Sequence, residues 1–144
     1  QDRDGWRHFV DRILELDRDQ MLPTMLSEHK KLVIVILDDA YLASFFWKDP
    51  STKRAMQTTR EKRNAATWYL EKRWSLITQN TLERVYLLRC QMIHGAATWN
   101  GKLNRTSLKR CIAFMGHFMT AILTIFIDRG ESEDWGPMCY PPVA

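Results

Sequence analysis

The sequence contains few residues that favour turns, since six of its 144 residues are glycine and five are proline. Such sparse turn signals suit a small number of long helices. Cysteine is also scarce. The three cysteines, Cys90, Cys111 and Cys139, are odd in number and have no paired spacing, which excludes a disulfide framework that uses all of them. Free thiols of this kind indicate a reducing, cytoplasmic location.

The common signatures of metal and nucleotide sites are missing as well. The sequence has no Cys-x-x-Cys pair, no His-Glu-x-x-His motif and no glycine-rich phosphate loop. We therefore expect no metal and no other cofactor. Three acidic residues near the end of the chain, Glu131, Glu133 and Asp134, are more simply a solvated turn than a magnesium site.

No apolar run is long enough for a comfortable membrane span. The run from Ile112 to Ile127 is interrupted by Gly116 and His117, and a spanning helix needs about 20 apolar residues. We interpret the run as a buried core or dimer helix and expect no contact with a membrane. No secretory signal is recognisable. Because the chain begins at Gln1 without a methionine, we expect it to be a truncated or processed form.

Apolar residues are abundant. They make up 45% of the sequence and include six tryptophans and seven methionines, which indicates a packed globule rather than a disordered chain. The length suits one domain over residues 1–144. A net charge of +4 is a mild bias toward anionic partners and is no nucleic-acid signature by itself.

Helical periodicity organises the first part of the chain. Apolar spacing predicts a first helix over residues 4–17, and Pro23 interrupts the segment that follows. Ser27 is placed to cap a second helix that continues to Asp38. The β-branched run Val33–Ile36 favours a strand by propensity. No partner strand is visible elsewhere in the sequence, so we predict a helix there.

Short breaks divide the remainder. Asp49-Pro50-Ser51 follows an aromatic segment, Tyr41–Trp47, and caps a long helix from about Thr52. The other predicted elements are a helix over 76–94, a loop ending at the cap residue Asn104, a helix over 105–127, and an irregular tail over 128–144 that Trp135 and Tyr140 tie to the domain.

The segment from residue 53 to residue 73 is rich in cations. We weigh two interpretations of it: a solvated helix face, which is the commoner role of a charge run, and a surface that contacts RNA. Lys62 and Arg63 are our candidates for that contact. The seven cations are Lys53, Arg54, Arg60, Lys62, Arg63, Lys72 and Arg73.

The most informative stretch is Arg89-Cys90-Gln91-Met92-Ile93-His94-Gly95, where an arginine and a histidine close a strongly apolar, helix-like segment. Burying a cation in such a stripe is costly unless an anionic or polar group meets it. A histidine titrates near neutral pH and can move protons in a phosphate reaction. The same spacing recurs at Arg3 and His8, so the spacing alone does not identify a site.

Arg89 lies on an apolar stripe, as a core or interface residue would. Five residues at about 100° per residue place His94 about 140° around the helix from Arg89, so one straight helix cannot aim both side chains at one phosphate. Bringing them together requires either unwinding at Gly95 or a second copy of the chain. The stripe consists of Leu82, Val85, Tyr86, Arg89, Met92 and Ile93.

The stretch from Leu82 to Arg105, LERVYLLRCQMIHGAATWNGKLNR, resembles HEPN domains, the small all-helical domains of many RNA-cutting toxins and defence proteins. It is most similar to a bacterial branch with a motif of the form LRNQLVHGxATWN. Tyr41–Trp47 and Asp134–Pro141 fit the same branch, so the resemblance covers roughly residues 10–143. It implies an all-α, antiparallel bundle of about four to five helices. It also implies a homodimer in which arginine and histidine from both subunits line one cleft.

The resemblance further implies a metal-independent endoribonuclease of a toxin or defence system, with RNA as substrate and an antitoxin or other protein as partner. His94 is the expected base for the RNA 2′-hydroxyl, and Arg89 is expected to stabilise charge on the phosphate. Cys90 departs from the branch, which usually has asparagine there to hold the phosphate or the histidine. Asn100, in the loop that follows, is the best candidate for a direct substrate contact.

Other interpretations stay open. A HEPN-like domain without catalysis would bind RNA or a nucleotide in the same cleft, or serve only for dimerisation, and Cys90 favours either role over an enzyme. From the residue pattern alone, Arg89 caps backbone carbonyls near the end of its helix and His94 is structural.

Overall fold

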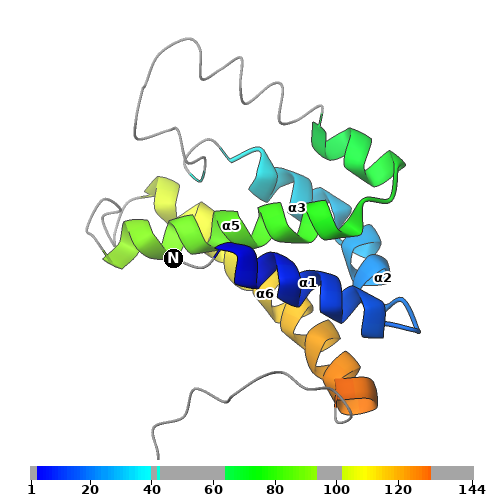
Figure 1. Ribbon diagram of the computed structural model, residues 1–144. Helices are drawn as coiled ribbons and strands as arrows, with labels where there is room; N and C mark the ends of the chain where they lie inside the picture. Colours follow the sequence, from blue (N-terminus) through cyan, green and yellow to red (C-terminus); the bar gives the residue numbers. More distant parts are fainter. Residues whose placement is uncertain (1–2, 40–41, 43–63, 94–101, 131–144) are drawn as a thin grey trace, which may run out of the picture.

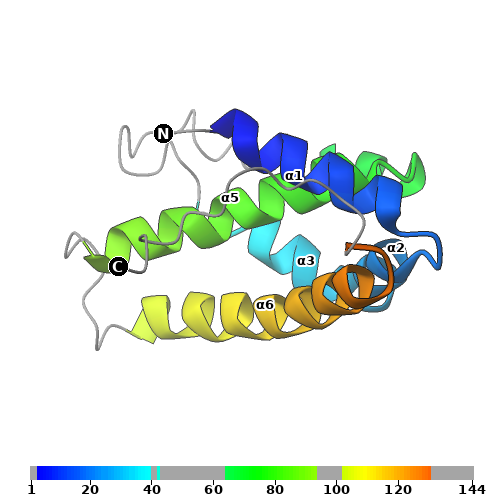
Figure 2. The ribbon, with the colours of Figure 1, turned by 60° about the horizontal axis from the view of Figure 1, so that its bottom comes forward.

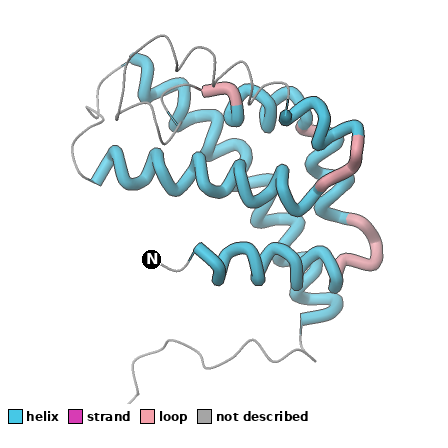
Figure 3. Tube along the Cα trace, turned by 45° about the horizontal axis from the view of Figure 1, so that its top comes forward, coloured by secondary structure: helices cyan, strands magenta, loops and turns pink. Residues whose placement is uncertain are grey.

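The computed structural model describes residues 3–39, 42, 64–93 and 102–130. Every regular element in these ranges is a helix, and none of them contains a strand, which confirms the predicted all-α fold (Figure 3). Residues 64–70 are also helical. The labelled helices are α1 (Arg3–Leu16), α2 (Met21–Glu28), α3 (Lys30–Leu37), α5 (Trp74–Ile93) and α6 (Lys102–Arg129).

The helices form a bundle around one core. In Figure 1, α1 and α5 lie side by side and run in opposite directions, while α6 crosses them on the other side of the core. Figure 2 shows α3 between α5 and α6, and α3 contacts both of them. The largest fully buried side chains come from all five labelled helices and from position 42; among them are Ile13, Leu22, Leu26, Val33, Ile36, Leu42, Ile77 and Phe114.

The β-branched run of α3 is helical, as predicted. Val33 and Ile36 are fully buried, whereas Val35 on the opposite side is 36% exposed. This helical spacing buries one side of α3 between α5 and α6, and the burial outweighs the strand propensity of the individual residues.

Asp17 joins α1 to α2. Its buried carboxylate accepts hydrogen bonds from the backbone N–H groups of Met21, at 2.7 Å, and Leu22, at 2.8 Å. These N–H groups belong to the first turn of α2, where a helix has no internal acceptors and where negative charge is favoured. Pro23 is also in this first turn, so its missing N–H costs no helical hydrogen bond.

The predicted cap at Ser27 is wrong. Ser27 lies inside α2, and the break falls two residues later at His29, whose φ of −107° and ψ of 27° separate α2 from α3. The bend lets both short helices turn their apolar sides to the same core. The ring of His29 stacks on that of His117 in α6, with centroids 3.6 Å apart, and this contact holds the corner against α6.

The later boundaries also differ from the prediction. The helical segment 64–70 ends at a turn in which Lys72 has a φ of 55°, so the cations Lys72 and Arg73 lie in a turn and not on a helix. α5 begins at Trp74, two residues earlier than predicted. The segment 64–70 is held on α2 by Tyr69, whose hydroxyl donates a 2.9 Å hydrogen bond to the carbonyl oxygen of Leu26.

The last helix is longer than predicted at both ends. α6 begins at Lys102, so Asn104 lies inside the helix and is not its cap. It ends at Arg129, so residues 128 and 129 belong to the helix and not to the tail. The chain between residues 102 and 115 contains neither glycine nor proline to stop the helix. Apart from the buried Leu42, the predicted segment Tyr41–Trp47 lies outside the described residues, as do the start of the long helix at Thr52 and the tail from residue 131.

We expect Asp17→Ala to lower the free energy of unfolding by about 1 to 2 kcal/mol, because two N–H groups of α2 lose a charged acceptor. Urea denaturation measures the change. Asp19→Ala is the matched control, since Asp19 lies in the same turn and is exposed, and it should change stability by less than about 0.5 kcal/mol. Equal effects of the two substitutions would contradict the capping role.

Candidate functional site

Arg89 lies on the exposed side of α5, near the end of the helix. Its apolar stripe lies at the edge of the core: Leu82 and Val85 pack against the core, but the fully buried residues of α5 come from an adjacent side of the helix. Leu82, Val85 and Tyr86 are half-buried, while Met92 is 45% and Ile93 62% exposed. A core position for Arg89 is therefore excluded, and the predicted interface position remains. The buried residues of α5 are Ile77, Thr78, Thr81, Leu88 and Gln91.

The stripe borders two open cavities, which share Val85, Arg89 and Met115 and which we call together the Arg89 trough. The α1-side cavity, of about 330 Å³, is lined by Gly5, Trp6, Phe9, Leu82, Val85, Tyr86, Arg89 and Met115. The α5-end cavity, of about 380 Å³, is lined by Val85, Leu88, Arg89, Met92, Ile93, Leu108, Cys111, Ile112 and Met115.

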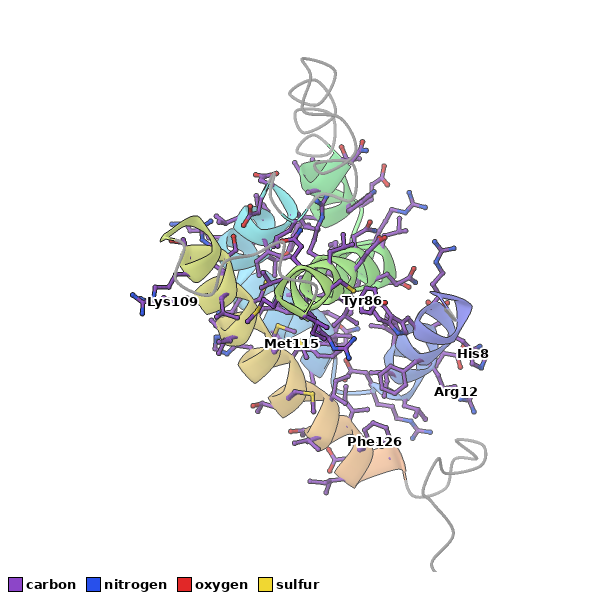
Figure 4. All side chains as sticks on the ribbon, turned by 90° about the vertical axis from the view of Figure 1, so that its left-hand side faces the viewer. His8, Arg12, Tyr86, Lys109, Met115 and Phe126 are labelled. Atoms are coloured by element: carbon purple, nitrogen blue, oxygen red, sulfur yellow. The ribbon has the colours of Figure 1, made fainter. Side chains whose placement is uncertain are left out.

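Aromatic contacts fix the walls of the trough. The rings of Trp6 and Tyr86 meet edge to face with centroids 5.1 Å apart, which joins α1 to α5. The rings of Phe9 and Phe126 are stacked with centroids 6.3 Å apart, which joins α1 to the end of α6. Figure 4 shows this face, with Met115 between α5 and α6 and Phe126 between α6 and α1. Contacts of this kind add to the stability gained from burial.

Arg89 is the one charged residue among the described residues that line the trough. Apolar surroundings strengthen the electrostatic interactions of a cation, and the planar guanidinium group binds phosphate or carboxylate through two parallel hydrogen bonds. An exposed arginine in an apolar trough can therefore bind an anionic group.

The other predicted site residues are distributed unevenly. Cys90 follows Arg89 on α5 and is a half-buried, free thiol. His94 comes directly after Ile93, the last residue of α5, and lies outside the described residues. Asn100, Lys62 and Arg63 lie outside them too. The structure thus places two of the six predicted site residues and leaves the distance between Arg89 and His94 as a prediction.

A polar contact lies near Cys111, which lines the α5-end cavity. Ser107 in α6 donates a 2.5 Å hydrogen bond from Oγ to Oδ2 of Asp39, which follows α3. Burial, and to a smaller extent the Asp39 carboxylate, raise the pKa of the nearby Cys111 thiol to about 11. The thiol is therefore protonated at neutral pH, which makes Cys111 a structural residue and not a nucleophile.

Sequence periodicity on α5 found Arg89, but it missed the residues that α1 and α6 contribute. Trp6, Phe9 and Met115 carry no pattern that separates trough residues from ordinary core residues. Within the described ranges, no group of three or more histidine, cysteine, aspartate or glutamate residues could hold a metal ion.

α6 also bears on the membrane prediction. Between Arg105 and Arg129 it is long and apolar enough to cross a membrane, although a core helix of a soluble protein would pass the same test. The helix extends beyond the apolar run from Ile112 to Ile127 at both ends. One third (33%) of its most apolar window is buried inside the bundle, and the buried residues include Phe114 and Phe118.

Comparison with protein-family models, curated proteins and solved structures gives no match for this chain.

We expect Cys111 to react with iodoacetamide at pH 8 far more slowly than Cys90. Raising a thiol pKa by two units, from 9.0 to about 11, leaves about a hundredfold less thiolate at that pH, and burial hinders access further. Peptide mass spectrometry of a Cys139→Ser variant measures both sites in one sample. The alkylation rate of Cys111 should rise only as the pH approaches 11. Equal rates at pH 8 would contradict the assignment.

Proposed function

We propose that this chain is a HEPN-type, metal-independent endoribonuclease, acting in a toxin or defence system, that cuts RNA by attack of the 2′-hydroxyl on the neighbouring phosphate. The observation that carries the proposal is the position of Arg89, the single charged lining residue of an exposed apolar trough. It lies five residues before His94 in the stretch that resembles the HEPN motif.

The chemistry needs a base, an acid and a stabiliser of negative charge. One His94 takes the proton of the 2′-hydroxyl while that oxygen bonds to phosphorus. The bond to the 5′-oxygen breaks, and this leaving group takes a proton from a second histidine. Arg89 binds the phosphoryl oxygens as their charge increases. The products are a 2′,3′-cyclic phosphate on one fragment and a 5′-hydroxyl on the other.

Two copies of the chain supply the second histidine. Arg89 and His94 diverge by about 140° on a continuous helix, so pairing across a twofold axis is a direct way to bring both to one phosphate. The surface beside Arg89 suits this role, because Met92, Ile93 and Ile112 are 45%, 62% and 62% exposed. Covering these side chains would remove apolar area from water.

The substrate is an RNA strand. The chain carries a net charge of +4, and the basic segment that includes Lys62 and Arg63 would add electrostatic attraction to a phosphate backbone. Asn100 would contact the substrate from the loop after His94. Few cysteines and no disulfide framework support a cytoplasmic location, where an antitoxin or another protein would restrain a nuclease of this kind.

Cys90 supports a second candidate function. A thiol is a weak hydrogen-bond donor, and it replaces the asparagine that would hold the phosphate or orient the histidine. A HEPN-like module that binds RNA or a nucleotide without cutting it, or that only dimerises, would tolerate this residue better than an enzyme.

The test compares single substitutions for cleavage of mixed RNA in EDTA. We expect Arg89→Ala and His94→Ala each to abolish cleavage, while RNA affinity falls only severalfold, because the basic segment supplies much of the attraction. His8→Ala and Arg18→Ala are the matched controls, since both residues are exposed and line neither cavity. Both should cleave like the unsubstituted chain, with an optimum near neutral pH and cyclic-phosphate ends.

Three results would count against the enzyme. Cleavage that survives His94→Ala would remove its proposed base. Loss of cleavage in EDTA would show that the reaction needs a metal. Absence of cleavage, together with RNA or nucleotide binding that Arg89→Ala weakens, would favour the binding module.

A further inference from the structure

The α1-side cavity is open, and almost all of its lining is apolar. Its walls come from α1, α5 and α6, and Arg89 is the single charge among the described residues at its edge. Exposed apolar cavities of this size usually bind a ligand or a segment of protein. No side chain of the described residues fills the α1-side cavity.

The end of α6 lies next to this cavity. A Cβ atom added at Gly130 would lie 2.7 Å from Cδ1 of Phe126, so the backbone at Gly130 packs directly on that ring. Phe126 in turn stacks on Phe9, which lines the cavity. The chain therefore leaves its last helix beside the cavity, one aromatic contact away from its wall.

The segment that follows has the composition of a docking peptide. Residues 131–144, with the sequence ESEDWGPMCYPPVA, contain Trp135 and Tyr140 and no lysine or arginine. Glu133 and Asp134 directly precede Trp135, so an indole in the cavity would bring carboxylates toward Arg89. The three prolines of the segment limit its backbone freedom, which lowers the entropy lost on docking.

The segment is long enough to reach the cavity, because Gly130 packs on Phe126, whose ring centroid lies 6.3 Å from that of the cavity residue Phe9. Trp135 is the fifth residue after Gly130, and an extended chain of five residues spans about 17 Å. The cavity volume of about 330 Å³ is large enough for an indole ring system. A segment joined to its own chain by a short linker has an effective concentration in the millimolar range, far above that of a free second copy at micromolar concentration.

We propose that residues 131–144 dock on their own chain, with Trp135 in the α1-side cavity between Phe9, Tyr86 and Met115. The carboxylates before Trp135 lie on the side of Arg89. The proposed occupant fills the α1-side cavity alone, and the α5-end cavity, lined by Met92 and Ile93, is not part of its binding site. This inference does not depend on RNA cleavage.

Paramagnetic relaxation in the full chain tests the docking. Cys90→Ala and Cys111→Ala leave Cys139, four residues after Trp135, as the single site for a nitroxide label. We expect the label to broaden the methyl signals of Leu82, Val85 and Met115 beyond detection. The methyl signals of Leu70 should keep their intensity, because Leu70 is 83% exposed near the other end of α5.

Two controls make each outcome decisive. Adding Trp135→Ala should restore the three trough signals if the indole holds the segment. In a mixture of labelled chain without isotopes and isotope-enriched chain without the label, broadening should be absent. Broadening in that mixture would show that a second copy supplies the segment, and would overturn the proposal. Trough signals unaffected by the label, or broadened equally with Trp135→Ala, would overturn it too.

Discussion

Every other labelled helix of the bundle packs against α6. This helix contacts α1, α2, α3 and α5, and its buried residues, among them Phe114, Phe118 and Ile122, form a large part of the shared core. Helices that cross at an angle diverge away from their contact point. The Arg89 trough lies along α6 around Met115: its α1-side cavity is lined by α1, α5 and α6, and its α5-end cavity by α5 and α6. The candidate site is therefore a consequence of how this one helix is covered.

The sequence predicted the helical class and several elements well, because apolar spacing reports burial directly. Val33 and Ile36 are helical despite their β-branching, since burial between two neighbours outweighs propensity. The caps were harder to predict. Ser27 and Asn104 have suitable side chains and lie inside helices, whereas the acceptor for α2 is Asp17, four residues before the helix begins. A rule that looks only at the residue next to a helix does not find such a cap.

Prediction of the site from the sequence is limited in a similar way. Periodicity identified the apolar stripe that contains Arg89, but a single helix pattern does not tell whether another helix covers that stripe. Among the described residues, Leu88 on the neighbouring side of α5 is buried, whereas Arg89 on the stripe is exposed. Trp6 and Phe9 come from a distant part of the sequence, so their role in the trough depends on the packing of α1 and has no local signal.

The proposed composite site requires two copies of the chain to meet at the α5-end cavity. Sedimentation velocity over a hundredfold range of concentration tests this directly, with Ile93→Glu set against Ile127→Glu. Both isoleucines are highly exposed, at 62% and 79%, but only Ile93 lines the trough. The account predicts a dimer that Ile127→Glu retains and Ile93→Glu reduces to monomer. A chain that is monomeric at every concentration, or a dimer that both variants form equally, would contradict it.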